Sequence, residues 1–395
     1  MFTLTPIDGG VCAPKGFFAD GISAGLKPDN QKDLAFIYSN TLCSIKAVFT
    51  TNRFQAAHIL HFKKHSIQKT NFVLINSKNA NAMTGDQGIE DIEQIMNKAC
   101  TIFKDIQNPV MSSTGIIGVP LPKDKIMKGL EDFDLEKKDG NSASKAIMTT
   151  DSYDKQIAFE VKLESGESFR IGAMAKGAGM INPAMATMLC FITTDAAIPE
   201  NEIEAVLKAC SEVTFNAISV DGDTSTNDTV MLLANQKSGI YDKEAFSYAL
   251  EIVMHELALK IVSDGEGASK CVAFKITGAA NNEEAVIAAK ALTNSLLVKT
   301  ALYGEDPNWG RIASTIGASG INCDPLKLTI TFGDVTVYNK GVILFDEEME
   351  HKAAKVMKKD AFSIHCDIGI GNGSFTAYGC DLGHEYVKIN ADYRT

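Results

Sequence analysis

The chain has 395 residues, too many for a typical single core, so we expect two domains or one large sandwich. With 45% hydrophobic and 22% charged residues, its composition is that of an ordinary globular protein. Its formal net charge of -11 argues against a nucleic-acid partner, because phosphate binding needs a basic face, but still allows small charged metabolites. The start of the chain lacks the features of a secretory signal, and no run approaches the roughly 20 apolar residues of a membrane helix. We therefore expect a cytoplasmic protein with no nucleic-acid or membrane partner.

The first part of the chain is rich in short runs typical of β-strands, at 34–38, 47–50 and 72–75. Apolar residues at helical spacing over 89–103 then predict an amphipathic helix. Further along, strands are expected at 188–192 and 229–233, and helices over about 203–210, 243–262 and 282–298. The C-terminal part returns to strands, at 328–332, 335–337, 362–364 and 374–376. Such mixing without a strict βαβ rhythm predicts an α/β fold, a layered sandwich of helices and mixed sheets.

Several motifs with conceivable chemistry have a simpler interpretation. His58, His61 and His65 are expected on the surface rather than in a metal site. The glycine-rich run 369–373 lies between two predicted strands and favours a tight hairpin turn over a phosphate cradle. Residues 221–229 could hold a hard cation or a phosphate, although a turn whose side chains cap their own backbone is the favoured reading.

Familiar catalytic signatures do not occur. The sequence has no G-x-S-x-G elbow, no Walker loop and no Ser-His-Asp spacing, and His255 lacks the second histidine of a zinc-protease helix. Its nine cysteines are scattered and form no C-x-x-C, so neither a zinc knuckle nor a disulfide framework is expected. A nucleophile in this chain must therefore be activated in another way.

Thr187 stands where a glycine- and proline-containing loop runs into a predicted apolar strand. A threonine at a chain terminus can use its own α-amine, with a pKa of about 8, as the base that activates its hydroxyl. To create that terminus, the Thr187 hydroxyl would attack the carbonyl of Ala186, helped by the small preceding residue and a strained turn. From the residues alone, this chemistry and an ordinary loop-to-strand junction both remain open.

Many further motifs follow one another along the chain, at 51–53, 76–85, 113–118, 148–151, 176–181, 185–189, 221–228, 264–268, 304–311 and 386–395. With these motifs in this order, the sequence closely resembles the ornithine acetyltransferase family, also called bifunctional glutamate N-acetyltransferase, of arginine biosynthesis. The resemblance covers nearly the whole chain.

The resemblance implies roles for individual residues. Thr187 would cut the bond after Ala186, producing fragments 1–186 and 187–395, and then serve as the nucleophile. The Thr114 hydroxyl and the Gly115 N–H would form the oxyanion hole. Substrate contacts are implied for Thr150, Lys176, Thr187, Glu266, Asn390 and Thr395. A cation and neutral donors suit a carboxylate, and an anion suits an ammonium group.

The implied reaction is ping-pong transfer of an acetyl group from N2-acetyl-L-ornithine to L-glutamate through an acetyl-Thr187 intermediate, without a metal or organic cofactor. Two copies of each fragment are the implied assembly. Whether acetyl-CoA is a second acetyl donor stays open. An aminopeptidase or amidase of the same nucleophile type, or a non-catalytic binding protein with an uncut chain, are the alternatives. Several residues depart from the family's usual pattern and bear on fine specificity, namely Lys78, Met83, Ala184, Gly383 and His384.

Overall fold

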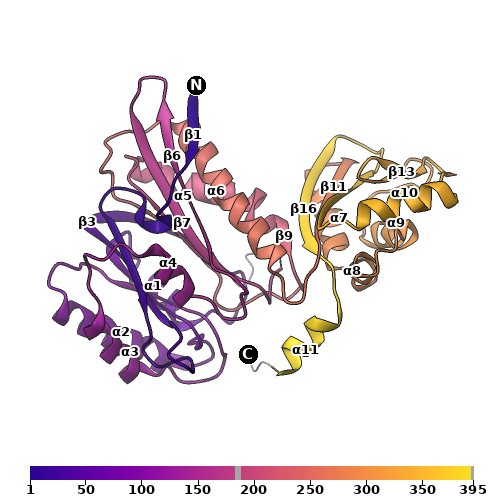
Figure 1. Cartoon of the computed structure of the whole chain (residues 1–395). Coiled ribbons are helices and arrows are strands. Elements are labelled where there is room, and N and C mark those ends of the chain that lie inside the picture. The colour runs from indigo at the N-terminus through magenta and orange to yellow at the C-terminus, as the bar shows by residue number, and fades with distance from the viewer. Residues whose placement is uncertain (183–187, 393–395) are drawn as a thin grey trace.

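Two β-sheets, each with its own covering helices, form two lobes of the molecule (Figure 1). The structure is a computed structural model that describes residues 1–182 and 188–392. Thr187, Ala186 and Thr395 therefore lie outside the described residues. The second lobe ends in a helix that extends from it toward the first lobe (Figure 1).

The first sheet is mixed and has nine strands within the described residues. Its strands β8 and β10 are parallel, as are β4 and β5, whereas the other pairings are antiparallel. Their order is β1 (Phe2–Pro6), β6 (Lys155–Leu163), β7 (Ser168–Lys176), β8 (Leu189–Thr194), β10 (Thr229–Ala234), β3 (Leu34–Phe49), β4 (Lys69–Asn76) and β5 (Val110–Ser113), with β2 (Phe17–Ile22) paired to β3.

Both faces of this sheet are buried. In β8, Cys190 and Ile192 belong to the core shared with the helices α5 (Glu200–Val213) and α6 (Lys243–Ser263). Leu189 and Phe191 face the opposite core, which includes α4. A strand covered on both sides reads as a continuous apolar run, which explains the sequence after Thr187. The other helices of this lobe are η1 (Gly10–Cys12), α1 (Ala57–Lys64), α2 (Gly85–Ile102), α3 (Lys123–Gly129), η2 (Leu130–Asp132), α4 (Gly140–Ala146) and η3 (Phe215–Ala217).

The second sheet is also mixed, and its apolar face packs under helices of the C-terminal part. Its strands, in order, are β14 (Val342–Ile343), β13 (Val335–Asn339), β12 (Thr329–Phe332), β15 (Ala361–Asp367), β11 (Cys271–Ala279), β16 (Gly373–Cys380) and β9 (Ile218–Ser219). The helices are α7 (Asn282–Asn294), α8 (Leu296–Tyr303), α9 (Trp309–Ala318), α10 (Glu347–Met357) and the final α11 (His384–Asp392). The predicted layered α/β fold with mixed sheets is thus confirmed.

Three predicted elements differ from the structure. The runs 34–38 and 47–50 belong to one long strand, β3, whose register with β4 shifts between Tyr38 and Cys43. The helix predicted over 282–298 breaks at Ser295, whose hydroxyl oxygen accepts a hydrogen bond from the Val298 N–H and so starts α8.

The predicted hairpin at 369–373 is wrong, because β15 and β16 are not neighbours. Strand β11 lies between them, and the connection passes over its end. There the N–H groups of Ile370 and Gly371 both donate to the carbonyl of Gly278. Periodicity reveals two strands and a turn, but not a third strand that arrives from elsewhere in the chain.

The surface position predicted for His58, His61 and His65, in and just after α1, is wrong for the first two. His58 and His61 are 1% and 6% exposed, because α1 packs against α2 and β5, whereas His65 is exposed. The ring of His58 also shares a hydrogen bond with the Thr229 hydroxyl, at 3.2 Å. Burial lowers the pKa of His58 to about 3 and that of His61 to about 4, so both rings are neutral at pH 7.

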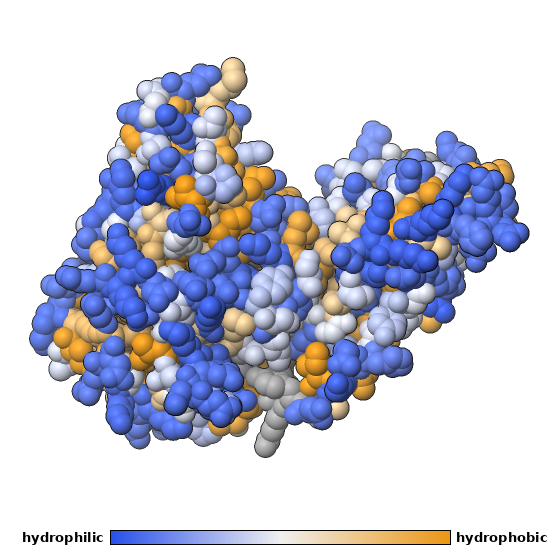
Figure 2. Space-filling model, viewed as in Figure 1, coloured by the Kyte–Doolittle hydropathy of each residue, from blue (hydrophilic) through white to orange (hydrophobic). Residues whose placement is uncertain are grey.

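No single helix of the described part is long and apolar enough to cross a membrane. The pair α7 and α8 passes the test of length and composition only when both are counted together, and the two are bent by 56°. Hydrophilic residues dominate the face in Figure 2, with apolar residues in smaller patches.

Candidate active site

A pocket of about 320 Å³ lies where loops of the first lobe meet α11. It brings together six residues that the sequence singled out, Thr114, Gly115, Thr150, Lys176, Glu266 and Asn390. Its other lining residues are Thr149, Gly179, Met180, Asp221, Asp223, Thr224 and Tyr386. Residues separated by nearly 280 positions in the chain thus share one small polar cavity.

Thr114 and Gly115 follow directly after β5 in a tightly fixed loop. The Thr114 N–H donates to the Asn76 carbonyl at 3.0 Å, and the Ile116 N–H donates to the Lys78 carbonyl at 3.1 Å. Between them, Gly115 has a φ of 134°, and a Cβ there would come within 2.2 Å of the Lys78 backbone. Only glycine fits this position. The Gly115 N–H has no partner among the described residues, which leaves it available to a ligand.

Asn227 holds this loop against the segment that precedes β10. Its side-chain amide donates to the carbonyl of Ala80 at 2.6 Å and to that of Ser113 at 2.8 Å. Asn227 is buried, so these bonds are shielded from water. The residue before Thr114 is therefore fixed by a side chain more than 100 positions away.

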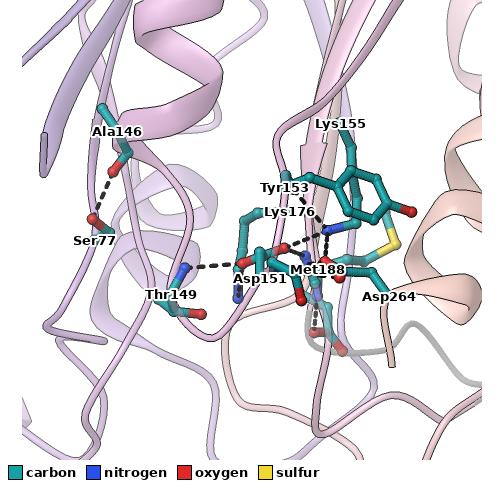
Figure 3. Close-up of polar contacts among 12 residues, drawn as sticks. Ser77, Ala146, Thr149, Asp151, Tyr153, Lys155, Lys176, Met188 and Asp264 are labelled. Carbon is teal, nitrogen blue, oxygen red and sulfur yellow. Dashed lines mark hydrogen bonds and ion pairs between the residues drawn. The ribbon is translucent and has the colours of Figure 1, made fainter. Parts of the chain in front are cut away.

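A buried network of charges around Asp151 lies beside the pocket residues Thr149 and Lys176 (Figure 3). Lys155 Nζ lies 2.8 Å from Asp151 Oδ1 and 2.5 Å from Asp264 Oδ2, and none of the three side chains is more than 3% exposed. Asp151 Oδ1 also accepts the Gly177 N–H at 2.6 Å. Asp151 Oδ2 accepts the Thr149 N–H at 2.9 Å and lies 4.0 Å from Lys176 Nζ. The network thus fixes the backbone beside two pocket residues, Thr150 and Lys176.

Charges in this network offset the cost of burial. Burial alone would raise the pKa of Asp151, but Lys176 and Lys155 outweigh it and hold that pKa at about 2. Burial lowers the pKa of Lys176, and the nearby carboxylates of Asp151 and Glu266 oppose the decrease. An anionic ligand in the pocket would therefore favour the protonated form of Lys176.

Glu266 and Asn390 connect the pocket to the end of the chain. The Asn390 side-chain amide donates to Glu266 Oε2 at 2.7 Å, across from α11 to the loop after α6. A Cβ on Gly179 would lie 2.5 Å from the Glu266 carboxyl group, so a side chain there would displace it. Glycine at 179 is needed for this close approach.

Asp221 and Tyr386 are pocket residues that the sequence did not single out individually. Asp221 accepts hydrogen bonds from the N–H groups of Met180, Ile181 and Asp223, at 2.6, 2.9 and 3.2 Å. The Tyr386 hydroxyl donates to Asp221 Oδ2 at 3.3 Å. The turn caps its own backbone as predicted, since the Asp223 N–H donates to Asp221 and the Asn227 N–H donates to Ser225. Asp221 also holds the backbone of residues 180–181. Burial raises the pKa of Asp221.

Asp228 directly precedes β10, and its side chain binds Met188, the residue after Thr187 and before β8. Its Oδ1 accepts the Met188 N–H at 3.1 Å, and the side chain is fully buried. Burial raises the pKa of Asp228 well above its usual range. The chain immediately after Thr187 is therefore anchored by a buried carboxyl group.

The pocket combines a lysine and a glutamate of opposite charge with neutral hydroxyls and a free backbone N–H. Such a set of groups in one small cavity is typical of an enzyme for a small zwitterionic substrate.

The chain matches the model of the ArgJ family over residues 18–395. It is 63% identical to the arginine biosynthesis bifunctional protein ArgJ of Wolinella succinogenes, with both chains covered completely. It is 43% identical to the protein of that name from Caldanaerobacter subterraneus, over 98% of this chain and 99% of the relative. The chain belongs to the ArgJ family.

Among solved structures, the ArgJ protein of Bacillus halodurans is 40% identical and covers 51% of this chain and 98% of its own, with a TM-score of 0.48. The ornithine acetyltransferase of Mycobacterium tuberculosis, solved as a complex with ornithine, is 31% identical. It covers 46% of this chain and 98% of its own, with a TM-score of 0.41.

Proposed function

We propose that this protein transfers the acetyl group of N2-acetyl-L-ornithine to L-glutamate, in arginine biosynthesis. Membership of the ArgJ family supports the reaction, since relatives of this chain carry the name of bifunctional arginine biosynthesis proteins. The pocket supports the substrate class. Lys176 offers a cation to a carboxylate and Glu266 an anion to an ammonium group, and an amino acid carries both.

In the first half of the reaction, the Thr187 hydroxyl attacks the acetyl carbonyl of acetylornithine. The α-amine of Thr187 accepts the hydroxyl proton, and the carbonyl oxygen becomes an oxyanion. The Thr114 hydroxyl and the Gly115 N–H donate to that oxygen. The C–N bond then breaks, ornithine leaves with the proton on its amine, and the acetyl group stays on Thr187 as an ester.

In the second half, the amine of glutamate attacks the same ester carbonyl. The oxyanion again receives the Thr114 and Gly115 donors, and Thr187 leaves as a hydroxyl. Thr150, Lys176, Glu266, Asn390 and Thr395 bind the amino-acid part of each substrate in turn. The same pocket is used twice because both substrates share an α-carboxylate and an α-nitrogen.

Thr187 becomes a chain terminus by cutting its own bond to Ala186. The mature protein then consists of fragments 1–186 and 187–395, with two copies of each in the assembly. The transfer itself uses no metal or organic cofactor, and acetyl-CoA is a candidate second acetyl donor. The location we propose is the cytoplasm. The resemblance to the family supports the cleavage, the assembly, the cofactor-free transfer and the location.

The observation that carries the proposal is the meeting of Thr114, Gly115, Lys176 and Glu266 in one pocket of about 320 Å³. The test is to mix the purified protein with acetylornithine, with and without glutamate, and to quantify ornithine and N-acetylglutamate. If the protein is a transferase, ornithine release should be sustained only when glutamate is present. Without glutamate, a single burst should release an amount of ornithine equal to the amount of enzyme. Sustained release without glutamate would identify an amidase, and no release would leave a binding protein.

A further inference from the structure

A second cluster of chemically active side chains lies away from the pocket. His61 and His65 lie at the C-terminal end of α1, and Glu93 lies on the neighbouring helix α2. One ligand atom from each of the three lies within 4.8 Å of the others. Within 1–182 and 188–392 no other group of three histidines, cysteines or carboxylates comes this close. None of the three residues lines the active-site pocket.

Helix geometry explains why the histidines meet. Residues four apart lie on the same face of a helix, one turn above the other. The imidazole rings of His61 and His65 accordingly have their centroids 4.5 Å apart. Packing of α1 against α2 brings Glu93 to the same place, with 3.3 Å between His65 Nε2 and Glu93 Oε1.

The cluster is accessible from solvent. His61 and His65 line an open cleft of about 470 Å³, together with residues 66–69 and 108–109. The side chains of His65 and Glu93 are 44% and 39% exposed, so both can rotate, whereas His61 is buried and fixed. An ion entering from the cleft would meet one fixed ligand and two adjustable ones, with space for water at its remaining positions.

Lys64 is the present partner of Glu93, with its Nζ 2.9 Å from Glu93 Oε1. Their side chains are 59% and 39% exposed, and an ion pair of this kind contributes at most about 1 kcal/mol. A divalent ion bound by two imidazoles as well can displace it. The lysine ammonium therefore marks a position where the structure already holds a positive charge.

We propose that His61, His65 and Glu93 bind a divalent transition-metal ion of the Zn²⁺ type. Two imidazole nitrogens and one carboxylate oxygen are the ligands of many zinc sites, and imidazole disfavours Ca²⁺ and Mg²⁺. Metal–ligand distances of about 2.0–2.2 Å require the three groups to move closer together, which the two exposed side chains allow. With three protein ligands, the fourth position of the ion is left to water. This proposal does not depend on the acetyl-transfer reaction.

The test is a calorimetric titration of the tag-free full-length protein with Zn²⁺, repeated with Co²⁺, whose visible absorption reports the coordination geometry. We expect one ion per chain and a tetrahedral Co²⁺ spectrum. Because His65 and Glu93 are exposed, His65→Ala and Glu93→Gln should fold normally, and each should weaken binding by more than about tenfold. Lys64→Gln should strengthen binding, since it removes the competing cation.

Matched controls separate this site from other metal-binding groups. His351→Ala removes an exposed histidine from α10, and Cys100→Ser removes the exposed thiol of α2. Both should leave the affinity unchanged, with circular dichroism confirming the fold of every variant. The proposal is overturned if the protein binds no stoichiometric Zn²⁺, or if His65→Ala and Glu93→Gln bind as tightly as the natural chain. Acetyl transfer, measured before and after chelation, tests the proposed function separately.

Discussion

Asp151 and Lys155 form an ion pair with 2.8 Å between Oδ1 and Nζ, and both side chains are completely buried. The same carboxylate accepts the N–H of Gly177, the residue after Lys176. One carboxyl group therefore fixes a loop of the candidate pocket and also lies near two buried lysines.

Replacing Asp151 by asparagine should destabilise the protein by about 3 kcal/mol, because Lys155 is left buried with Asp264 as its only carboxylate partner among the described residues. Urea unfolding of the two proteins measures the difference. Glu160→Gln is the matched control, since it removes a half-exposed partner of Arg170. The control substitution should lower the free energy of unfolding by less than about 1 kcal/mol. If both substitutions lowered the free energy of unfolding equally, burial of the Asp151 pair would not contribute to stability.

The difference in unfolding free energy between the natural protein and Asp151→Asn should change with pH in a defined direction. The pKa of Asp151 falls from 3.8 to about 2 on folding, so its contribution is complete above 3.8 and is lost as the pH falls toward 2. The free-energy gap between the natural protein and Asp151→Asn should therefore narrow below pH 3.8. Denaturant unfolding at a series of acidic pH values measures this gap, and a gap that widens on acidification would contradict the assignment.

The local sequence pattern was sufficient to predict helices whose apolar periodicity lies within one continuous segment. The apolar spacing of 89–103 gave α2, and that of 243–262 gave α6. It failed where the decisive neighbour is distant in sequence. The hairpin predicted at 369–373 is instead a connection over β11, which lies about 90 positions earlier.

The residues of the candidate site were likewise predicted only in part. Resemblance to a family supplied the candidates Thr114, Lys176 and Glu266, and the structure brings them into one pocket. Asp221 and Tyr386 lie within the motifs 221–228 and 386–395 but received no individual role, because a carboxylate in a polar turn and a tyrosine near the C-terminus carry no pattern of their own. Their significance comes from the hydrogen bond between them, across 165 positions.

Replacing Thr187 by alanine should abolish both self-cleavage and acetyl transfer, because the same hydroxyl oxygen is proposed to attack in both. Thr187→Ser should retain part of each activity, since serine keeps the hydroxyl but lacks the methyl group that restricts χ1. A denaturing gel detects cleavage, and ornithine release measures transfer. Thr187→Ala that is cut and active at the normal rate would exclude Thr187 as the nucleophile.

The fragments 1–186 and 187–395 should remain associated after cleavage. Strand β8 from the second fragment pairs with β7 from the first, and β10 pairs with β3, so the cut would separate neighbours within one sheet. Exposing the apolar faces of β8 would also be costly. Gel filtration should therefore give one peak that contains both fragments on a denaturing gel. Separate elution without denaturant would contradict this prediction.

Replacing Glu266 by glutamine should raise the KM for acetylornithine by about tenfold or more, because the proposed charged hydrogen bond to the substrate is lost. Turnover should change less, since this contact exists already in the ground state. Glu385→Gln on α11 is the control, as Glu385 is exposed and pairs only with Lys388 at 3.4 Å among the described residues. An unaltered KM in Glu266→Gln would remove Glu266 from the binding contacts.

Replacing Thr114 by alanine should lower turnover by about 10²–10³ with little change in KM. Its hydroxyl is proposed to donate to an oxyanion, which exists only in the transition state and the tetrahedral intermediate, so substrate binding should survive. The Gly115 N–H remains in the variant and should support residual activity. Thr114→Ser, which keeps the hydroxyl, is the matched control and should recover most of the rate.

Each Thr114 variant must first be checked for cleavage at Thr187, because an uncut chain would mimic a catalytic defect. A raised KM with normal turnover would make Thr114 a binding contact and place the oxyanion hole elsewhere.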